Sequence, residues 1–300
     1  MRRNLSISYL WSAFLMHNTF ISKHMSDETY LKQVFRGYAG YPLNLSKPTT
    51  YNEKLQWLKL YDIKPIYTTM VDKCEAKKYA ASIIGEEFII PTLGVWDKFD
   101  DIDFDVLPNQ FVLKCTHDSG GLVICKDKSQ IDIEVTKKKI NKCLERNFFW
   151  EGREWPYKNI KPRIIAEKYM EEGQGGDLKD YKYFVFNGEA KALFIASDRQ
   201  KIDEDTKFDF FDMNYKHLNF TNGHPNACPP PEKPINFEKM RKLTEKLASD
   251  IPELRVDFYE VNGSVYFGEL TFFHWSGLVP FEPEKWDEIF GSWIVLPDIK

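Results

Sequence analysis

Two carboxylates stand in a stretch that otherwise has the composition of a half-buried β-hairpin. Asp257 and Glu269 lie twelve positions apart, on either side of Asn262-Gly263, a dipeptide typical of a tight hairpin turn. Burying an acid in an apolar strand is costly unless a cation pairs with it. The pair therefore predicts a Mg²⁺ site that keeps open positions for phosphate oxygens. The alternative is a solvated face on which Asp257 only pairs with Arg255 or a nearby lysine.

The register of this hairpin decides whether the two acids can meet. Side chains alternate between the two faces of a strand, so a strict two-residue turn would put Asp257 and Glu269 on opposite faces. A β-bulge, or a loop of odd length, would put both on one face. We predict the second arrangement, with Thr271 adding a hydroxyl two residues after Glu269.

A second stretch, residues 110–121, could hold an anion. A lysine at the end of a buried strand can reach a phosphate as a point charge. A glycine pair lets backbone N–H groups approach an anion closely, and neighbouring hydroxyls add donors. The residues concerned are Lys114, Thr116, Ser119, Gly120 and Gly121. A strand resumes directly afterwards, so the unit is neither a Walker A loop nor a GxGxxG fingerprint. An ordinary glycine hairpin is the alternative.

Two isolated lysines could join the same site. Lys73 directly follows Asp72 in a helical segment, where it is either a phosphate contact or part of a solvated surface. Lys182 alternates with Tyr183 along a strand, so it points away from Tyr183 and toward a cleft.

An acidic loop offers a competing site for a nucleotide. Asp101-x-Asp103 has the DxD pattern of a glycosyltransferase that binds a nucleotide sugar through Mn²⁺. The alternative, which we favour, is an exposed acidic loop that precedes a strand.

Composition limits the classes of function. The chain has 300 residues, enough for two or three small domains that share one cleft. Its net charge is −4, with both signs interspersed, which excludes a general nucleic-acid binder. The five cysteines are scattered without a CxxC pair, which indicates reduced thiols in a cytosol and argues against a zinc cluster.

The N-terminal segment is apolar but too short and too polar to span a bilayer. Tyr9, Ala13, Met16 and Phe20 fall on one face of a helix. The helix either packs on the body of the protein or lies on a membrane surface. Residues 1–70 as a whole are expected to be mainly helical, and strands follow from residue 88 onward, with a second hairpin at Asn187-Gly188.

In this order the pieces resemble the ATP-grasp superfamily, over residues 71–275. The pieces are Asp72-Lys73, Lys114 with its glycine loop, Glu167-Lys168-Tyr169-Met170, Lys182, Arg255-x-Asp257 and Glu269-x-Thr271. Within the superfamily, the sequences DYKYFVFNG and GELTF resemble the TupA-like branch. That branch is associated with bacterial surface-polysaccharide gene clusters, and some members have been labelled glycosyltransferases.

The resemblance implies an α+β fold with adenine held between two sheets. The implied units are a helical region at 1–70, a lid subdomain with its lead-in helix at 71–165, and a C-terminal subdomain with the metal-binding hairpin at 166–300. Lys73 and Lys114 would contact the phosphates of ATP under a lid formed by Thr116, Ser119, Gly120 and Gly121. Adenine would be lined by Glu167 and the backbone of Lys168, Tyr169 and Met170.

The remaining roles implied by the resemblance lie around the hairpin. Lys182 would reach the γ-phosphate and Arg255 the transferring phosphate, which makes these two the catalytic residues. Asp257, Glu269 and Thr271 would hold Mg²⁺. The part of the site that binds the substrate would contain His274, Ser276 and Gly277. The family pattern usually has asparagine where this chain has Thr271, which leaves open how many Mg²⁺ ions bind.

The activity that the resemblance implies is ATP-dependent ligation of a carboxylate to an amine through an acyl phosphate. Its partners would be a small amine or amino acid and a carboxylate-bearing sugar or glycan, with no nucleic acid. The enzyme would be cytoplasmic, at the inner face of the membrane if the N-terminal helix or a lipid-linked glycan brings it there. His117 or His274 could take the proton of the amine, although a binding or structural role is favoured for both. The alternatives are the glycosyltransferase and a non-catalytic scaffold.

Overall fold

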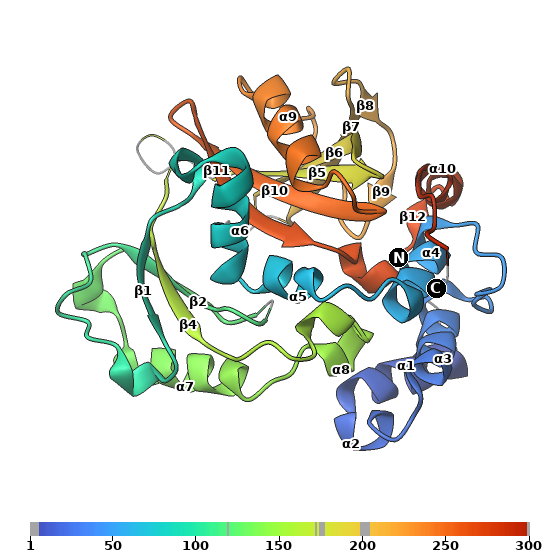
Figure 1. Cartoon of the computed structure of the whole chain (residues 1–300), viewed down its shortest axis with the longest axis horizontal. Helices are drawn as coiled ribbons and strands as arrows, with labels where there is room; N and C mark the ends of the chain where they lie inside the picture. The colour runs from blue at the N-terminus through green and yellow to red at the C-terminus, as the bar shows by residue number, and fades with distance from the viewer. Residues whose placement is uncertain (1–5, 119, 172, 174–177, 199–204, 299–300) are drawn as a thin grey trace.

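Two antiparallel β-sheets of unequal size form the body of the protein (Figure 1). The computed structural model describes residues 6–118, 120–171, 173, 178–198 and 205–298, and every structural statement below concerns these residues. The smaller sheet has four strands in the order β1-β4-β2-β3, and the larger has six in the order β11-β10-β5-β6-β7-β8. The predicted α+β class is therefore confirmed.

The bounds of the elements are as follows. The smaller sheet contains β1 (Thr92–Trp96), β2 (Phe111–Cys115), β3 (Leu122–Cys125) and β4 (Ile164–Lys168). The larger contains β5 (Asp180–Phe186), β6 (Glu189–Ser197), β7 (Lys207–Asp212), β8 (His217–Leu218), β10 (Glu253–Val261) and β11 (Ser264–Thr271), and β9 (Thr221–Asn222) pairs with β12 (Phe281–Glu282). The helices are α1 (Ile7–His17), α2 (Thr19–Ser22), α3 (Asp27–Ala39), α4 (Tyr51–Tyr61), α5 (Ile66–Val71), α6 (Glu75–Ile84), α7 (Ile133–Leu144), α8 (Phe149–Gly152), α9 (Phe237–Leu247) and α10 (Lys285–Trp293).

Alternation along the central strand β5 divides the larger sheet into two covered faces. The Tyr183 hydroxyl donates to the carbonyl of Phe237 at the start of α9, 3.0 Å away, so Tyr183 lies on the face that α9 covers. The next residue, Phe184, points the other way and meets the rings of Tyr51 from α4 and Phe290 from α10. Because both faces are covered, β5 is buried along its whole length.

The smaller sheet presents one face to α7 and the other to the larger sheet. Phe111 and Leu113 of β2 pack with Ile140 of α7 in one apolar cluster. The residues between and after them, Val112 and Lys114, line a cavity together with Tyr259 of the larger sheet. The period of two along β2 therefore sends every second side chain into the space between the two sheets.

The expected helical N-terminal region is confirmed, but the predicted face of its first helix is wrong in part. Helices α1 and α3 share a small core with Leu15 and Phe35 at its centre. Tyr9, Ala13 and Met16 are half-buried, whereas Phe20 lies on the separate helix α2 and is 78% exposed. Because α1 ends at His17, the helical spacing does not carry over to Phe20.

Arg153 fastens the N-terminal helices to the rest of the molecule. Its guanidinium pairs with Asp27 of α3 at 3.0 Å and donates to the carbonyl of Ser22 in α2. The same group lies over the rings of Tyr30 and Trp150, at 4.3 and 4.6 Å from their centroids. Arg153 is 1% exposed, so these contacts, and not water, compensate its charge.

The hairpin β10–β11 contains the bulge that its acids require. Val261 pairs with Ser264 across the two-residue turn, and this register holds as far as Phe258 opposite Phe267. The register then shifts by one residue at Gly268, so that Asp257 stands directly opposite Glu269. A built Cβ at Gly268 would lie 3.0 Å from the carbonyl oxygen of Asp257, which makes a larger residue crowded at the bulge. The predicted bulge is confirmed.

The three-part division of the chain stays a prediction. The boundary drawn after residue 165 falls within β4, whose five residues belong to the smaller sheet.

Replacing Arg153 with methionine should loosen the N-terminal helices. Arg153→Met keeps a long side chain but removes the ion pair, the hydrogen bond and the cation–π contacts, so we expect a loss of about 2 kcal/mol of unfolding free energy. Urea unfolding measures this loss, and limited proteolysis should cut residues 7–39 faster. Arg241→Met, which breaks a partly exposed pair with Glu245 on α9, should change stability by about 0.5 kcal/mol at most. Equal stability of the two variants would contradict the assigned role.

Candidate functional site

Three neighbouring strands bring the predicted catalytic and metal-binding side chains together. Lys182 of β5 stands opposite Asp257 of β10, which stands opposite Glu269 of β11, so the three form one row across the sheet. In the next row on the same face, Arg255 stands opposite Thr271. Directly opposed residues share a face and lie close together. The bulge is therefore what places Glu269 in the row.

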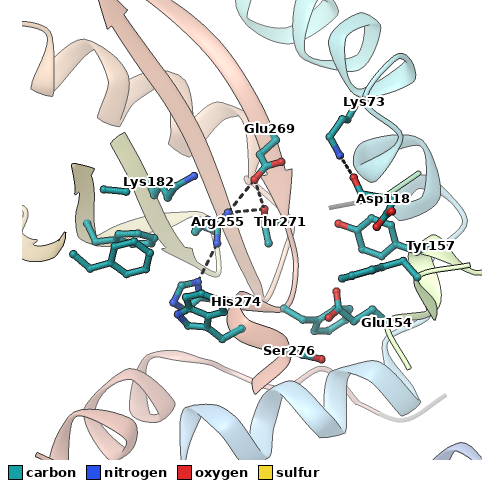
Figure 2. A pocket seen from close by; sticks show the side chains of 16 residues that line it. Lys73, Asp118, Glu154, Tyr157, Lys182, Arg255, Glu269, Thr271, His274 and Ser276 are labelled. Carbon is teal, nitrogen blue, oxygen red and sulfur yellow. Dashed lines mark hydrogen bonds and ion pairs between the residues drawn. The ribbon is translucent and has the colours of Figure 1, made fainter. Parts of the chain in front are cut away.

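Arg255 is the centre of the hydrogen-bond network in these rows (Figure 2). Its Nε and Nη2 each donate to the Asp257 carboxylate at 2.8 Å. Nη2 also donates to Glu269 Oε1 at 3.1 Å and to Thr271 Oγ1 at 3.0 Å. Lys182 Nζ contacts Asp257 Oδ2, the oxygen that also accepts from Arg255 Nη2, and lies 3.1 Å from Asp180 Oδ2. Asp257 thus pairs with Arg255, as one alternative held, but in a buried site rather than on a solvated face.

The acids of this cluster outnumber its cations, which fits a divalent ion. Three carboxylates, Asp180, Asp257 and Glu269, meet the two cations Lys182 and Arg255. Burial raises the pKa of Asp257 against the opposing charges of Arg255 and Lys182. For Glu269, burial is outweighed by Lys182 and Arg255, which lower its pKa well below the ordinary value. Oxygen ligands of this kind, with a half-exposed Glu269 side chain facing a cavity, suit Mg²⁺.

His274 orients Arg255 and is held neutral. Arg255 Nη1 lies 2.9 Å from His274 Nδ1 and, being a guanidinium, must donate there. The proton of the ring is therefore on Nε2, which donates to Asn222 Oδ1 at 2.9 Å. Burial and the charges of Arg255 and Lys182 hold the pKa of His274 far below its ordinary value. Because both ring nitrogens are engaged and the ring resists protonation, His274 is a positioning residue in this structure.

The predicted adenine-lining residues do lie around one cavity. A space of about 280 Å³ between the sheets is lined by Glu167, Lys168, Tyr169 and Met170, with apolar side chains from β2 and β3. Glu167 itself clamps two lysines, because its carboxylate lies 2.6 Å from Lys77 Nζ and 2.6 Å from Lys114 Nζ. Burial opposes its charge, but Lys114 and Lys77 lower the pKa of Glu167 to about 2.

The predicted phosphate residues are only partly brought together. Lys73, Lys114 and Gly121 line a cavity of about 160 Å³, into which Lys182 and Glu269 also face. Lys73 Nζ donates to the carbonyl of Asp118 at 2.5 Å. Thr116 is fully buried and lines neither of these two cavities nor the larger one described below. Ser119 lies outside the described residues.

Two more residues predicted to face the ligand have packing roles here. A Cβ on Gly121 would lie 2.6 Å from the sulfur atoms of Cys115 and Cys143, so this glycine lets α7 approach β2. A Cβ on Gly277 would lie 2.5 Å from Gln56 Nε2, so that glycine lets α4 approach. His117 lies inside, with Nε2 donating toward the carbonyls of Cys143 and Arg146, and burial lowers its pKa.

A larger cavity continues the site beyond the acids. It encloses about 410 Å³ and is lined by Lys182, Arg255 and Glu269 at one side, with His274 and Ser276 as predicted. Figure 2 shows Glu154 and Tyr157 on the opposite side from Lys182. The rest of the wall is aromatic, from Phe148, Phe194, Phe208, Phe273 and Trp275. Three cavities therefore adjoin, because each neighbouring pair shares lining residues.

Sequence reasoning missed Glu154, a buried carboxyl at the far end of this cavity. Glu154 is 5% exposed, and burial raises its pKa despite the charge of Lys59 and a hydrogen bond from Ser276. Lys59 Nζ donates to Ser276 Oγ at 2.8 Å, so the Ser276 hydroxyl is free to donate its proton to Glu154. Burial lowers the pKa of Lys59 to about 8. No local pattern around Glu154 marked it, because its partners come from α4 and from the turn after β11.

Two other acidic clusters lie apart from these cavities. Asp101 and Asp103 line none of the three, and the Asp103 carboxylate accepts from the backbone of Asp105. Asp72 and Glu75 lie close enough for a shared ion, but Arg163 Nη2 donates to both carboxylates at 3.0–3.2 Å and already supplies a positive charge.

Neutralising Glu167 should destabilise the protein and change its acid sensitivity. Glu167→Gln leaves two lysines in a largely buried site without their counter-charge, which costs about 3 kcal/mol or more. The folded-state pKa of about 2 is below the ordinary 4.5, so this stabilisation is present above pH 4.5 and is lost as the pH falls toward 2. Urea unfolding at several pH values between 7 and 3 should show a shallower acid-side decline in Glu167→Gln. Glu171→Gln, at an exposed position on the same segment, should retain the wild-type decline, and a parallel decline in all three proteins would disprove the role of the clamp.

Comparison with known proteins places the chain in a family. The family model described as TupA-like ATPgrasp matches residues 53–295. No curated protein matches the sequence significantly. Among solved structures, D-alanine–D-alanine ligase of Helicobacter pylori is 17% identical, with a TM-score of 0.41, over 82% of this chain and 69% of that one. The corresponding ligase of Bacillus anthracis is 17% identical, with a TM-score of 0.39, over 75% of this chain and 59% of that one. D-cycloserine synthetase DcsG is 14% identical, with a TM-score of 0.40, over 69% of this chain and 64% of that one.

These structural similarities are too distant to transfer an activity, and the family match is what identifies the chain. It covers the acids of the hairpin, the three cavities and the strands that surround them. The chain therefore belongs to the TupA-like ATP-grasp family.

Proposed function

We propose that the protein is an ATP-dependent carboxylate–amine ligase. The observation that carries the proposal is the series of three adjoining cavities with the acid cluster at its centre. An apolar cavity for a base leads to a small cavity lined by lysines and acids, and this leads to a larger cavity with charge at both ends. Such an order suits transfer of a phosphoryl group from ATP to a substrate held beyond the metal site.

The residues of the chain divide the work between binding and charge stabilisation. Adenine would lie in the cavity lined by Glu167 to Met170, and Lys73 and Lys114 would face the phosphates. Asp257, Glu269 and Thr271 would hold Mg²⁺, which supplies charge neutralisation at the phosphates when bound. Lys182 and Arg255 lie beside these acids, where they can stabilise negative charge that develops during transfer.

The reaction that fits this arrangement has two balanced steps. A carboxylate oxygen of the substrate attacks the γ-phosphorus of ATP, the bond to ADP breaks, and an acyl phosphate forms. The nitrogen of an amine then attacks the acyl carbon, the bond to phosphate breaks, and the nitrogen gives up a proton. Because water would hydrolyse the acyl phosphate, the aromatic wall of the larger cavity has a clear role in excluding it.

Glu154 is the group best placed to receive the amine. It is buried at the end of the larger cavity, and its raised pKa reflects a carboxylate whose charge is incompletely compensated. An ammonium group would supply the missing positive charge, and the carboxylate could then take up the proton that the nitrogen must lose. Lys59, through Ser276, would keep Glu154 oriented toward the cavity.

The finer identity of the substrates rests on the family resemblance. We infer that the carboxylate belongs to a sugar acid of a bacterial surface polysaccharide, such as a capsule or O-antigen, and that the amine is an amino acid or a related small molecule. The exposed ring of Trp275, 40% accessible at the wall of the larger cavity, offers a surface on which a sugar ring could stack. Such an enzyme would act in the cytoplasm, where ATP is available.

The metal assignment predicts nucleotide binding that depends on Glu269. ATP with Mg²⁺ at 100 times its Kd would stabilise the folded state by about 2.7 kcal/mol, a rise in Tm of at least about 4 °C, and ATP without Mg²⁺ would do less. Glu269→Gln, which preserves shape at a half-exposed position, should lose more than half of the Mg²⁺-dependent rise. Asp257→Asn should lose it too, but it also strands two buried cations.

Differential scanning fluorimetry measures these shifts. Glu189→Gln, at an exposed pair with Lys191 on β6, is the matched control and should behave as wild type. A Tm rise with UDP-sugars and none with ATP would overturn the proposal and direct attention to Asp101. Unchanged Mg²⁺-dependent ATP binding in both Glu269→Gln and Asp257→Asn would contradict the assignment of Mg²⁺ to these two acids.

Substitution of Glu154 should separate nucleotide binding from use of the amine. In an ADP-release assay with uronic acids and a panel of amino acids, Glu154→Gln should lower the amine-stimulated rate at least tenfold, because the neutral amide neither attracts an ammonium group nor accepts its proton. The Mg²⁺-ATP shift should persist, since Glu154 lies at the opposite end of the cavity from Lys182 (Figure 2). Glu151→Gln, three residues earlier on α8, is the control, and an equal loss in both variants would refute the specific role of Glu154.

A further inference from the structure

Helix α1 turns its apolar side away from the protein. Ile7, Leu10, Trp11 and Phe14 fall at i, i+3, i+4 and i+7, which makes one stripe along the helix. All four are exposed, from 44% for Phe14 to 87% for Ile7. An amphipathic helix of a globular protein ordinarily buries such a stripe and exposes its polar side.

The inward side of α1 combines the apolar Leu15 with small and polar residues, and its packing is satisfied. Ser12 is fully buried, and its hydroxyl lies 2.8 Å from the carbonyl of Ser8 and 2.9 Å from that of Gln33 in α3. A Cβ on Gly37 would lie 2.0 Å from Ser12 Oγ, so α3 approaches α1 where only glycine fits. Rotating the helix to bury its apolar stripe would break this contact. The outward position of the stripe is therefore built into the packing of α1 on α3.

The second helix extends the exposed apolar surface. Phe20 and Ile21 of α2 are 78% and 37% exposed. Together with the stripe of α1 they form what we call the N-terminal apolar face: Ile7, Leu10, Trp11, Phe14, Phe20 and Ile21. Clusters of exposed large apolar side chains generally mark a surface that contacts a partner or a lipid.

The charge of this segment distinguishes between the two kinds of partner. Residues 1–26 contain Arg2, Arg3 and Lys23 and no aspartate or glutamate, in a chain whose net charge is −4. Cationic side chains beside exposed aromatic and aliphatic ones are the composition of helices that lie on anionic bilayers. A second copy of the chain would bring two positively charged segments together, which charge repulsion disfavours.

We propose that the N-terminal apolar face docks the protein on the surface of an anionic phospholipid bilayer. Helix α1 lies in the plane of the interface, with its apolar stripe among the acyl chains and its basic neighbours at the head groups. None of the helices within the described residues is long and apolar enough to cross a membrane.

Docking in this way would bring the substrate cavity close to the bilayer. Helices α1 and α2 pack against α8, and Arg153 directly after α8 binds both α2 and α3 (Figure 1). The next residue, Glu154, lines the larger cavity. The membrane-facing helices and the wall of the cavity are thus joined through a few residues, an arrangement that suits a substrate carried on a lipid.

Vesicle flotation with the full chain tests this proposal. Vesicles of phosphatidylcholine alone and of phosphatidylcholine with an equal part of phosphatidylglycerol are the two probes. We expect at least tenfold more protein bound to the anionic vesicles, and less binding in 0.5 M salt because the ions screen the basic residues. The double variant Leu10→Ser/Phe14→Ser should reduce binding at least tenfold, since both side chains are exposed in the absence of lipid.

Two controls separate docking from a general effect of apolar residues. Ile235→Ser removes an apolar side chain that is 89% exposed before α9, and it should leave vesicle binding unchanged. The double variant should keep the wild-type Tm and any Mg²⁺-ATP shift, so a failure of the ligase proposal would not affect this test. Equal flotation of wild type and the double variant would overturn the proposal. So would a concentration-dependent dimer that the double variant abolishes, with no binding to either vesicle.

Discussion

The buried ion network around Asp257 is the constraint on which the rest of the site depends. Arg255 holds Asp257, Glu269 and Thr271, and Lys182 shares the Oδ2 atom of Asp257 with Arg255. Such charges are tolerated at a sheet surface only when each has a partner within hydrogen-bonding distance. The network therefore fixes the side-chain positions of three strands together. The half-exposed Glu269 side chain also leaves oxygen atoms that can bind a divalent cation.

The two sheets contribute different kinds of side chain to the cavities between them. The larger sheet, covered on both faces, is rigid enough to hold charged side chains in a fixed row. The smaller sheet contributes apolar side chains and Lys114, which Glu167 restrains from its own neighbouring strand. A nucleotide between them would contact a charged wall and an apolar wall at once. The two walls meet at Lys114 and Tyr259, which line both the cavity of about 280 Å³ and the cavity of about 160 Å³.

The inner and outer sides of the N-terminal helices differ in their contacts. Their attachment through Arg153 is a buried, multiply paired contact, whereas their outer face exposes large apolar side chains. The proposed attachment to a bilayer requires this combination of a firm inner contact and an apolar outer face. Against α3, α1 buries Ser12 at Gly37 and leaves its apolar stripe exposed.

The sequence by itself determined the residue types of the site, the two hairpins and the alternation that separates Lys182 from Tyr183, because these depend on neighbours a few positions apart. It also restricted the acids to two registers, and the cost of burying an unpaired acid favoured the one that puts both on one face. Only the tertiary structure decided that Gly268 forms the bulge, that Lys77 and Lys114 share Glu167, and that Glu154 enters the cavity. It also decided that Thr116 is buried outside the three cavities and that Gly277 packs against α4. Each of these depends on pairing between segments far apart in the chain, some 90 residues apart for Lys77 and Glu167. Local periodicity carries no information about such contacts, since they are selected by the packing of the whole fold.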